Sequence, residues 1–180
     1  TTLKEKEERM LAFFRKIAKN DNIKINQAVY ESEKLTGDRN RAMAYLLKND
    51  GVINGDVEEI LDLYFKQCSI EIDCVDLARI GLIFANYGID IETGERVISE
   101  NVSRMVKTFM VTCGMYDASG EFAIKVGIPA KSGVGGGIMA SVPRKMGIGV
   151  YGPSLDKKGN SIAGIKVLED LSKQLELSIF

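Results

Sequence analysis

The chain has 180 residues, 45% of them hydrophobic, which is enough to bury one sizeable core and fits a single domain better than two. Its 24 Lys and Arg residues against 25 Asp and Glu leave a formal net charge of -1, so no cationic excess favours a nucleic-acid or membrane partner. The chain has no histidine, which excludes a Ser-His-Asp triad, a Cys-His pair and a histidine-ligated metal within it. Hydrolytic chemistry here must use lysine, tyrosine or a carboxylate as its base.

The cellular location is predicted from the cysteines and from the apolar segments. Cys68, Cys74 and Cys113 are an odd number at spacings that match no disulfide or zinc framework, so we expect reduced, buried thiols. No apolar run approaches the roughly 18 residues of a membrane-spanning helix, and the charged start of the chain does not have the pattern of a signal peptide. We therefore expect a cytoplasmic protein.

Amphipathic helices are predicted in the first 113 residues, because apolar side chains recur there at helical spacing among charged ones. Turns rich in Gly, Asn and Asp separate them. Asp38 and Asp56 are expected to cap the helices that follow. The predicted ranges are residues 3–19, 27–35, 39–48, 57–68, 75–87 and 101–113.

The pattern changes after Gly114. Phe122, Ile124 and Val126 alternate with more polar residues, which predicts a half-buried strand over 121–128 after a turn at 116–120. Residues 131–142 and 146–151 are predicted as two further antiparallel strands, with Pro143 in their hairpin connection because proline cannot donate within a central ladder. A final helix over 161–177 has an apolar side that suits packing on the sheet. The chain is thus predicted as one α+β piece, with about 1–113 helical and 114–180 forming the sheet and terminal helix.

The least ordinary segment is 128–137, where four glycines fall within five positions. Glycine weakens a strand interior, so this density indicates that something approaches the backbone closely. One interpretation is a ligand whose oxyanion accepts from an unobstructed backbone N–H, with Lys131 adding positive potential. The other is a β-bulge or a tightly packed strand face, which the glycines alone favour.

Lys131-Ser132-Gly133 resembles the Lys-Thr/Ser-Gly element of β-lactamases and penicillin-binding enzymes. It lies within a longer string that resembles the bacterial and mitochondrial serine-dependent glutaminases, and this resemblance covers nearly the whole chain in order. It implies part of a β-lactamase-like fold and hydrolysis of the L-glutamine side-chain amide to L-glutamate and ammonia through a serine acyl-enzyme. The matching segments are 32–33, 37–40, 64–65, 68–71, 93–97, 113–117, Gly120, 127–134 and 155–161.

The resemblance assigns roles to five residues. It implies that Glu33 binds the substrate ammonium and Asn40 the α-carboxylate, a division that suits the charges of an amino acid. Tyr64 becomes a pocket residue, although an aromatic residue on a helix is typical of a core. Tyr116 is assigned to substrate binding and, beside the nucleophile, to general acid/base work, which suits a site without histidine. Val134 is assigned to the oxyanion hole through its main-chain N–H.

The nucleophile of the resembled family is the serine of an S-x-x-K motif, and the resemblance places this motif upstream of the matched region. We therefore expect the 180 residues to be the C-terminal part of a glutaminase domain, carrying half of the pocket, with doubtful activity when isolated. The chain's own S-x-x-K, from Ser154 to Lys157, matches a non-catalytic loop and is rejected as the nucleophile. Lys131 and Ser132 line the site by analogy with the fold and receive no catalytic role.

Two alternative functions stay open at this point. One is a penicillin-recognising serine hydrolase of the same fold, suggested by Lys131-Ser132-Gly133 alone. The other is a non-catalytic interaction or oligomerisation module. The glutaminase resemblance implies L-glutamine as the substrate, a homo-oligomer, and neither a metal nor an organic cofactor.

Overall fold

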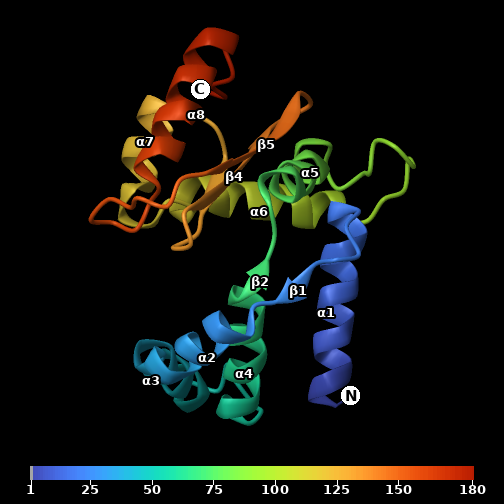
Figure 1. The fold of residues 1–180 in the computed structure, drawn as a ribbon, viewed down its shortest axis with the longest axis vertical. Helices are drawn as coiled ribbons and strands as arrows, with labels where there is room; N and C mark the ends of the chain where they lie inside the picture. The colour runs from blue at the N-terminus through green and yellow to red at the C-terminus, as the bar shows by residue number, and fades with distance from the viewer. Residues whose placement is uncertain (1) are drawn as a thin grey trace. The chain divides into compact units, whose positions relative to one another are not determined.

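The structure is a computed structural model that describes residues 2–180 (Figure 1). The chain divides into two compact units. The first consists of Thr1–Lys16 and Asn20–Ile72, and the second of Ile17–Lys19 and Asp73–Phe180. Helices and small antiparallel sheets make up both, as predicted for an α+β chain. No helix within residues 2–180 combines the length and the apolar character needed to cross a bilayer.

The first unit is mainly helical. It contains most of α1 (Leu3–Ala18), then α2 (Gln27–Thr36), α3 (Asp38–Asn49) and α4 (Val57–Cys68). Two short strands that were not predicted, β1 (Lys24–Ile25) and β2 (Ile70–Glu71), pair antiparallel. The core of this unit is a cluster of buried side chains from α2, α3 and α4, namely Tyr30, Ala44, Val57, Leu61 and Phe65.

The predicted helix caps of this unit have different outcomes. Asp56 caps α4 as expected, since its carboxylate accepts from the backbone N–H of Glu59 at 2.9 Å. The expected cap at Asp38 is wrong, because Asp38 is the first residue of α3 and Gly37 is the cap. A Cβ at Gly37 would lie 2.4 Å from Cζ of Phe65, so this corner between α2 and α3 is too close to α4 for any side chain.

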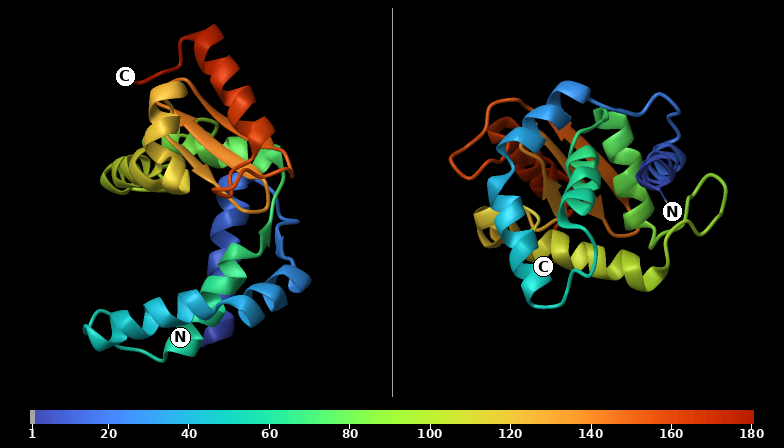
Figure 2. Two further views of the ribbon diagram at one scale, coloured as in Figure 1. Left: turned by 90° about the vertical axis from the view of Figure 1, so that its left-hand side faces the viewer. Right: turned by 90° about the horizontal axis from the view of Figure 1, so that it is seen from below.

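The second unit is built on a three-stranded antiparallel sheet. Its strands are β3 (Ala130–Ser132), β4 (Gly137–Val142) and β5 (Met146–Tyr151), in the order β3-β4-β5. Around it lie α5 (Cys74–Ala85), α6 (Glu100–Cys113), the 3₁₀ helix η1 (Tyr116–Ala118), α7 (Ser119–Lys125) and α8 (Ile162–Leu175). In the views of Figure 2, α7 and α8 lie on one side of the sheet and α5 on the other.

The two faces of this sheet are packed differently. Ile138, Ala140 and Val142 of β4 point to the side of α7 and α8 and form a core with Phe122 and Leu168. The opposite face lies against α5 and carries glycines on β5. A Cβ added to Gly147 would lie 2.0 Å from the carbonyl oxygen of Ala78, and one added to Gly149 would lie 2.1 Å from that of Cys74. The backbone of α5 therefore packs directly on the backbone of β5.

The strand predicted over 121–128 is wrong, because this segment is α7 followed by a loop. In a strand, Phe122, Ile124 and Val126 would share one face. The structure buries Phe122 and Val126, which are four residues apart, and leaves Ile124 89% exposed. This is helical spacing, and the pair Glu121–Lys125, also four residues apart, forms an ion pair at 2.8 Å.

The strand predicted over 131–142 is two strands separated by a tight turn at 133–136. The turn is closed by backbone hydrogen bonds from Gly133 N to Gly137 O and from Gly136 N to Gly133 O, both 2.9 Å. Gly136 has φ +97°, and a Cβ there would lie 2.6 Å from the Gly152 oxygen. The glycine-rich segment is thus a hairpin turn in close contact with a neighbouring backbone.

Other predictions for this unit agree with the structure. β5 has the predicted bounds, and its connection to β4 turns at Arg144, which has a positive φ of 59°. The terminal helix is α8, which ends at Leu175 because Glu176 adopts the left-handed conformation. The expectation of buried thiols is wrong: the cysteines are free, but Cys68 and Cys113 are exposed and Cys74 is half-buried.

Candidate active site

Glu33, Asn40 and Tyr64 lie in the first unit, on α2, α3 and α4 respectively. Glu33 and Asn40 are half-buried on either side of the Gly37 corner. Tyr64 is 45% exposed, and its ring meets that of Phe65 edge-on at a centroid distance of 5.9 Å. Phe65 also fills the space against Gly37, so one buried ring supports the segments that carry all three residues.

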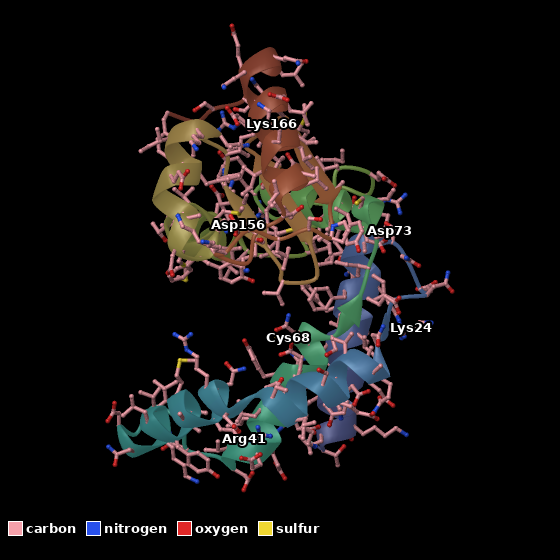
Figure 3. The ribbon with its side chains drawn as sticks, turned by 60° about the vertical axis from the view of Figure 1, so that its left-hand side comes forward. Lys24, Arg41, Cys68, Asp73, Asp156 and Lys166 are labelled. Atoms are coloured by element: carbon pink, nitrogen blue, oxygen red, sulfur yellow. The ribbon has the colours of Figure 1, made fainter. Side chains whose placement is uncertain are left out.

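Arg41 adds a second link between these helices. Its guanidinium lies 5.6 Å from the centroid of the Phe65 ring, and its Nη2 donates to the carbonyl oxygen of Lys34 at 2.7 Å. The side chain, labelled in Figure 3, therefore connects the end of α2 to α4 from its position on α3. Stacking of a guanidinium on an aromatic face gives such a link a defined geometry.

A charged network fixes α2 against α4. The carboxylate of Asp62 accepts from Lys34 Nζ at 2.7 Å, from Lys66 Nζ at 2.9 Å and from the hydroxyl of Tyr30. Burial by itself would raise the pKa of the Asp62 carboxyl, but these donors outweigh it and hold the pKa well below its ordinary value. The same bonds raise the pKa of Lys34. The helices that carry Glu33 and Tyr64 are thus joined by charge-assisted hydrogen bonds.

Tyr116 and Val134 lie in the second unit. Tyr116 opens η1 with φ 52°, a left-handed conformation that is uncommon for a residue with a large side chain. Its hydroxyl donates to the carbonyl oxygen of Ser132 at 3.2 Å. Nζ of Lys131 lies 4.7 Å from the centroid of the Tyr116 ring and donates to the same carbonyl. The ring is 37% exposed, so solvent or a ligand can reach it.

Val134 lies in the turn between β3 and β4. The backbone hydrogen bonds that close this turn use the N–H groups of Gly133 and Gly136, and the N–H of Val134 takes part in neither. A Cβ placed on Gly159 would lie 3.6 Å from Cε2 of Tyr116 and 3.7 Å from Cγ1 of Val134. The structure therefore brings Tyr116, Val134 and the Lys131-Ser132 segment together around one loop.

Two polar residues beside Tyr116, Ser119 and Asn160, were given no role from the sequence, although Asn160 lies in the matching segment 155–161. Ser119 accepts from the N–H of Met115 at 3.0 Å and donates to the carbonyl oxygen of Tyr116 at 2.8 Å. Nδ2 of Asn160 donates to the carbonyl oxygen of Met115 at 3.2 Å. Both side chains are buried. The sequence pattern does not predict the Asn160 contact, because Asn160 is 44 residues away from Tyr116 in the chain and follows an ordinary turn sequence.

Comparison with known proteins assigns the chain to a family. A family model described as Glutaminase matches residues 1–180. A glutaminase of Clostridioides difficile (strain 630) is 80% identical over 178 residues, which cover 99% of this chain and 58% of that protein. A glutaminase of Clostridium botulinum (strain Loch Maree / Type A3) is 67% identical over 176 residues, 98% of this chain and 58% of that protein. The chain thus spans less than two thirds of the length of these relatives.

Solved structures agree with this assignment. The crystal structure of a Bacillus glutaminase has a TM-score of 0.93 to this chain at 43% identity, covering 99% of this chain and 61% of the other. A Bacillus subtilis glutaminase, in covalent complex with 5-oxo-L-norleucine formed from 6-diazo-5-oxo-L-norleucine, has a TM-score of 0.91 at 44% identity. That match covers 96% of this chain and 61% of the other. These likenesses confirm the predicted α+β, β-lactamase-like fold, and with a family model that matches its whole length the chain belongs to the glutaminase family.

Proposed function

We propose that this chain is part of a glutaminase, an enzyme that hydrolyses the side-chain amide of L-glutamine to L-glutamate and ammonia. The observation that carries the proposal is the arrangement around Tyr116. Its hydroxyl donates to the Ser132 carbonyl beside the Lys131 ammonium, and Gly159 lies next to both its ring and the Val134 side chain. The covalent complex of the Bacillus subtilis relative with 5-oxo-L-norleucine, a glutamine-like amino acid, also supports this substrate class.

Recognition of the amino acid is assigned to the first unit. We propose that the Glu33 carboxylate accepts from the substrate ammonium and that the Asn40 amide donates to the α-carboxylate, with the Tyr64 hydroxyl as a further polar contact. Charge-assisted bonds of this kind fix a zwitterion and leave its side-chain amide in a defined place. The buried Phe65 ring and the Asp62 network support this role, because they hold the helices of these residues in one geometry.

The chemical step is assigned to a serine that the glutaminase resemblance places upstream of the matched region. Its hydroxyl oxygen attacks the side-chain carbonyl carbon of glutamine, and ammonia leaves once the amide nitrogen has taken a proton. Water then attacks the acyl-enzyme and releases L-glutamate and the serine. We propose that the Tyr116 hydroxyl relays the proton and that the Val134 N–H donates to the developing oxyanion. No step requires a metal or organic cofactor.

The assembly and location of the enzyme are also proposals. We propose that residues 1–180 act as one functional piece of a glutaminase domain and that the enzyme is a cytoplasmic homo-oligomer. Apolar side chains on the surface of α3 and α6 support self-association, since such groups favour burial against a partner. Leu46 is 60% exposed, Met105 58% and Phe109 59%.

Ammonia release from L-glutamine tests the proposed activity. Two proteins are compared: the 180-residue chain, and an extended protein in which this chain follows an upstream glutaminase segment with the S-x-x-K serine that the resemblance implies. We expect the extended protein to release ammonia and to lose this activity when that serine becomes alanine. A folded extended protein that turns over a β-lactam and not glutamine would instead support the penicillin-recognising alternative.

Replacement of Glu33 by glutamine should raise KM for glutamine by about tenfold to a hundredfold, the worth of a hydrogen bond to a charged group. The change removes the charge that faces the substrate ammonium and keeps the shape of the side chain. Initial rates of ammonia release by the extended protein, over a range of glutamine concentrations, measure this KM. The matched control is Glu31→Gln on the same helix, where the exposed carboxylate accepts from Gln27 at 3.0 Å. Equal KM values for both variants would contradict the assignment of Glu33.

A further inference from the structure

The backbone at Tyr116 is held in an unfavourable conformation by its surroundings. A left-handed φ costs energy in a residue with a Cβ and persists only where neighbouring contacts determine it. The direction in which the Tyr116 ring leaves the backbone depends on this φ. Whatever fixes the peptide groups on either side of Tyr116 therefore fixes the place of its hydroxyl.

Two buried side chains hold these peptide groups. The Ser119 hydroxyl connects the N–H of Met115 to the carbonyl oxygen of Tyr116, with bonds of 3.0 and 2.8 Å. The Asn160 amide donates to the carbonyl oxygen of Met115 at 3.2 Å, next to a backbone bond from the N–H of Ala118 at 3.1 Å. The carbonyl groups of both peptide bonds that flank Tyr116 thus accept hydrogen bonds from buried side chains, since Ser119 is 5% exposed and Asn160 0%.

Asn160 is itself fixed by the loop that precedes α8. The carboxylate of Asp156, labelled in Figure 3, accepts from the N–H groups of Lys158 and Asn160 at 2.8 and 3.0 Å. The N–H of Asp156 donates to the carbonyl oxygen of Asn160 at 2.8 Å. Gly159, at φ +90°, faces both the Tyr116 ring and the Val134 side chain. One loop therefore borders the tyrosine and the turn that carries the proposed oxyanion donor.

The Asn160 side chain is poorly suited to a role in stability alone. Its Oδ1 is buried and has no hydrogen-bond partner among residues 2–180. A buried acceptor without a partner carries the full cost of losing its water, so an apolar side chain of similar size could serve packing as well. What such a side chain could not supply is the N–H that meets the Met115 carbonyl.

We propose that Asn160 and Ser119 are positioning residues that hold Tyr116 in the geometry its proton transfer requires. This inference rests on the proposed glutaminase function and extends it to residues that contact neither the substrate nor the reacting atoms. Displacement of a reacting group by about 1 Å can lower a rate by about 100-fold. Asn160→Ala and Ser119→Ala should each lower kcat for glutamine by up to about that factor and leave KM nearly unchanged.

The test uses the extended protein described above, and its control is Ser172→Ala. Ser172 is also buried and donates to a backbone carbonyl, but it lies on α8 and this carbonyl is that of Val126, just after α7, and not one of the Tyr116 turn. We expect kcat of Ser172→Ala to match that of the parent protein. Combined with Tyr116→Phe, Asn160→Ala should cost little further activity, because both act on the same hydroxyl. Additive losses, or equal losses in the control, would overturn the proposal.

A second measurement is independent of activity. The amide proton of Ala118 reports on the turn, since it is bonded to the Met115 carbonyl and not to either replaced side chain. Its hydrogen exchange should be faster in Asn160→Ala and Ser119→Ala than in the parent, and unchanged in Ser172→Ala. Unchanged exchange in the first two variants would overturn the positioning role. If the variants show these differences in exchange but the parent protein releases no ammonia, the glutaminase function is refuted, whereas the role of Asn160 and Ser119 in positioning Tyr116 is not.

Discussion

Tyr116→Phe should lower kcat for glutamine hydrolysis by about 10²- to 10⁴-fold, because a positioned proton donor or acceptor contributes that much to a rate. Phenylalanine keeps the ring that faces the Lys131 ammonium and loses only the hydroxyl bonded to the Ser132 carbonyl. KM should change much less than kcat, since recognition of the amino acid is assigned to Glu33 and Asn40. Steady-state ammonia release by the extended protein measures both constants.

Tyr87 offers a closely matched control for this experiment. It also has a left-handed backbone, with φ 55°, and Nζ of Lys107 lies 3.7 Å from the centroid of its ring. We expect Tyr87→Phe to leave kcat unchanged, because this tyrosine has no assigned part in the reaction. If Tyr116→Phe also kept full activity, the proton-transfer role would be wrong, and Tyr116 would be a structural residue of the turn.

Gly147→Ala should destabilise the protein by about 3 kcal/mol or more, at the upper end of what overpacking costs. The new Cβ would lie 2.0 Å from the carbonyl oxygen of Ala78 and 2.2 Å from the nitrogen of Leu82. Both are backbone atoms of α5, so no side chain can rotate away and the helix must move off the strand. In a chain of this length, that loss corresponds to a fall in Tm of roughly 6 to 12 °C.

The control for this stability measurement is Gly120→Ala. Gly120 is in α7, and a Cβ there would meet nothing within 4 Å. Alanine is a better helix former than glycine by about 1 kcal/mol, so this variant should unfold at the same temperature as the parent or slightly above it. Thermal unfolding followed by far-ultraviolet circular dichroism compares the three proteins. A Tm for Gly147→Ala within a degree or so of the parent value would contradict the direct backbone packing of α5 on β5.

The helices of this chain could be predicted from its sequence because their apolar residues recur over three or more turns. In α4 the pattern and the Asp56 cap agree, and the predicted bounds are those of the structure. The segment of α7 is too short for this kind of inference. Alternation and helical spacing both place Phe122 and Val126 on one face, and only the exposure of Ile124 distinguishes a helix from a strand here.

The candidate site shows a similar division. The glycines near Val134 predict that something approaches the backbone closely. The structure confirms a close approach, of Gly136 to Gly152, but the glycines form a turn and not a strand. The five assigned residues came from motifs shared with a family, and their roles stay proposals. The contacts of Asn160 and Ser119 with the Tyr116 turn could not be predicted. They depend on a left-handed φ and, for Asn160, on a residue 44 positions downstream of Tyr116, and neither produces a periodic pattern in the sequence.

The left-handed backbone of Tyr116 sets stability and activity against each other at a single position. A glycine there would adopt the same φ without steric cost and would relieve strain of about 1 kcal/mol. It would also remove the hydroxyl on which the proposed chemistry depends. Selection for thermal resistance alone therefore gives the tyrosine little protection, whereas selection for both properties should keep it and improve the protein elsewhere.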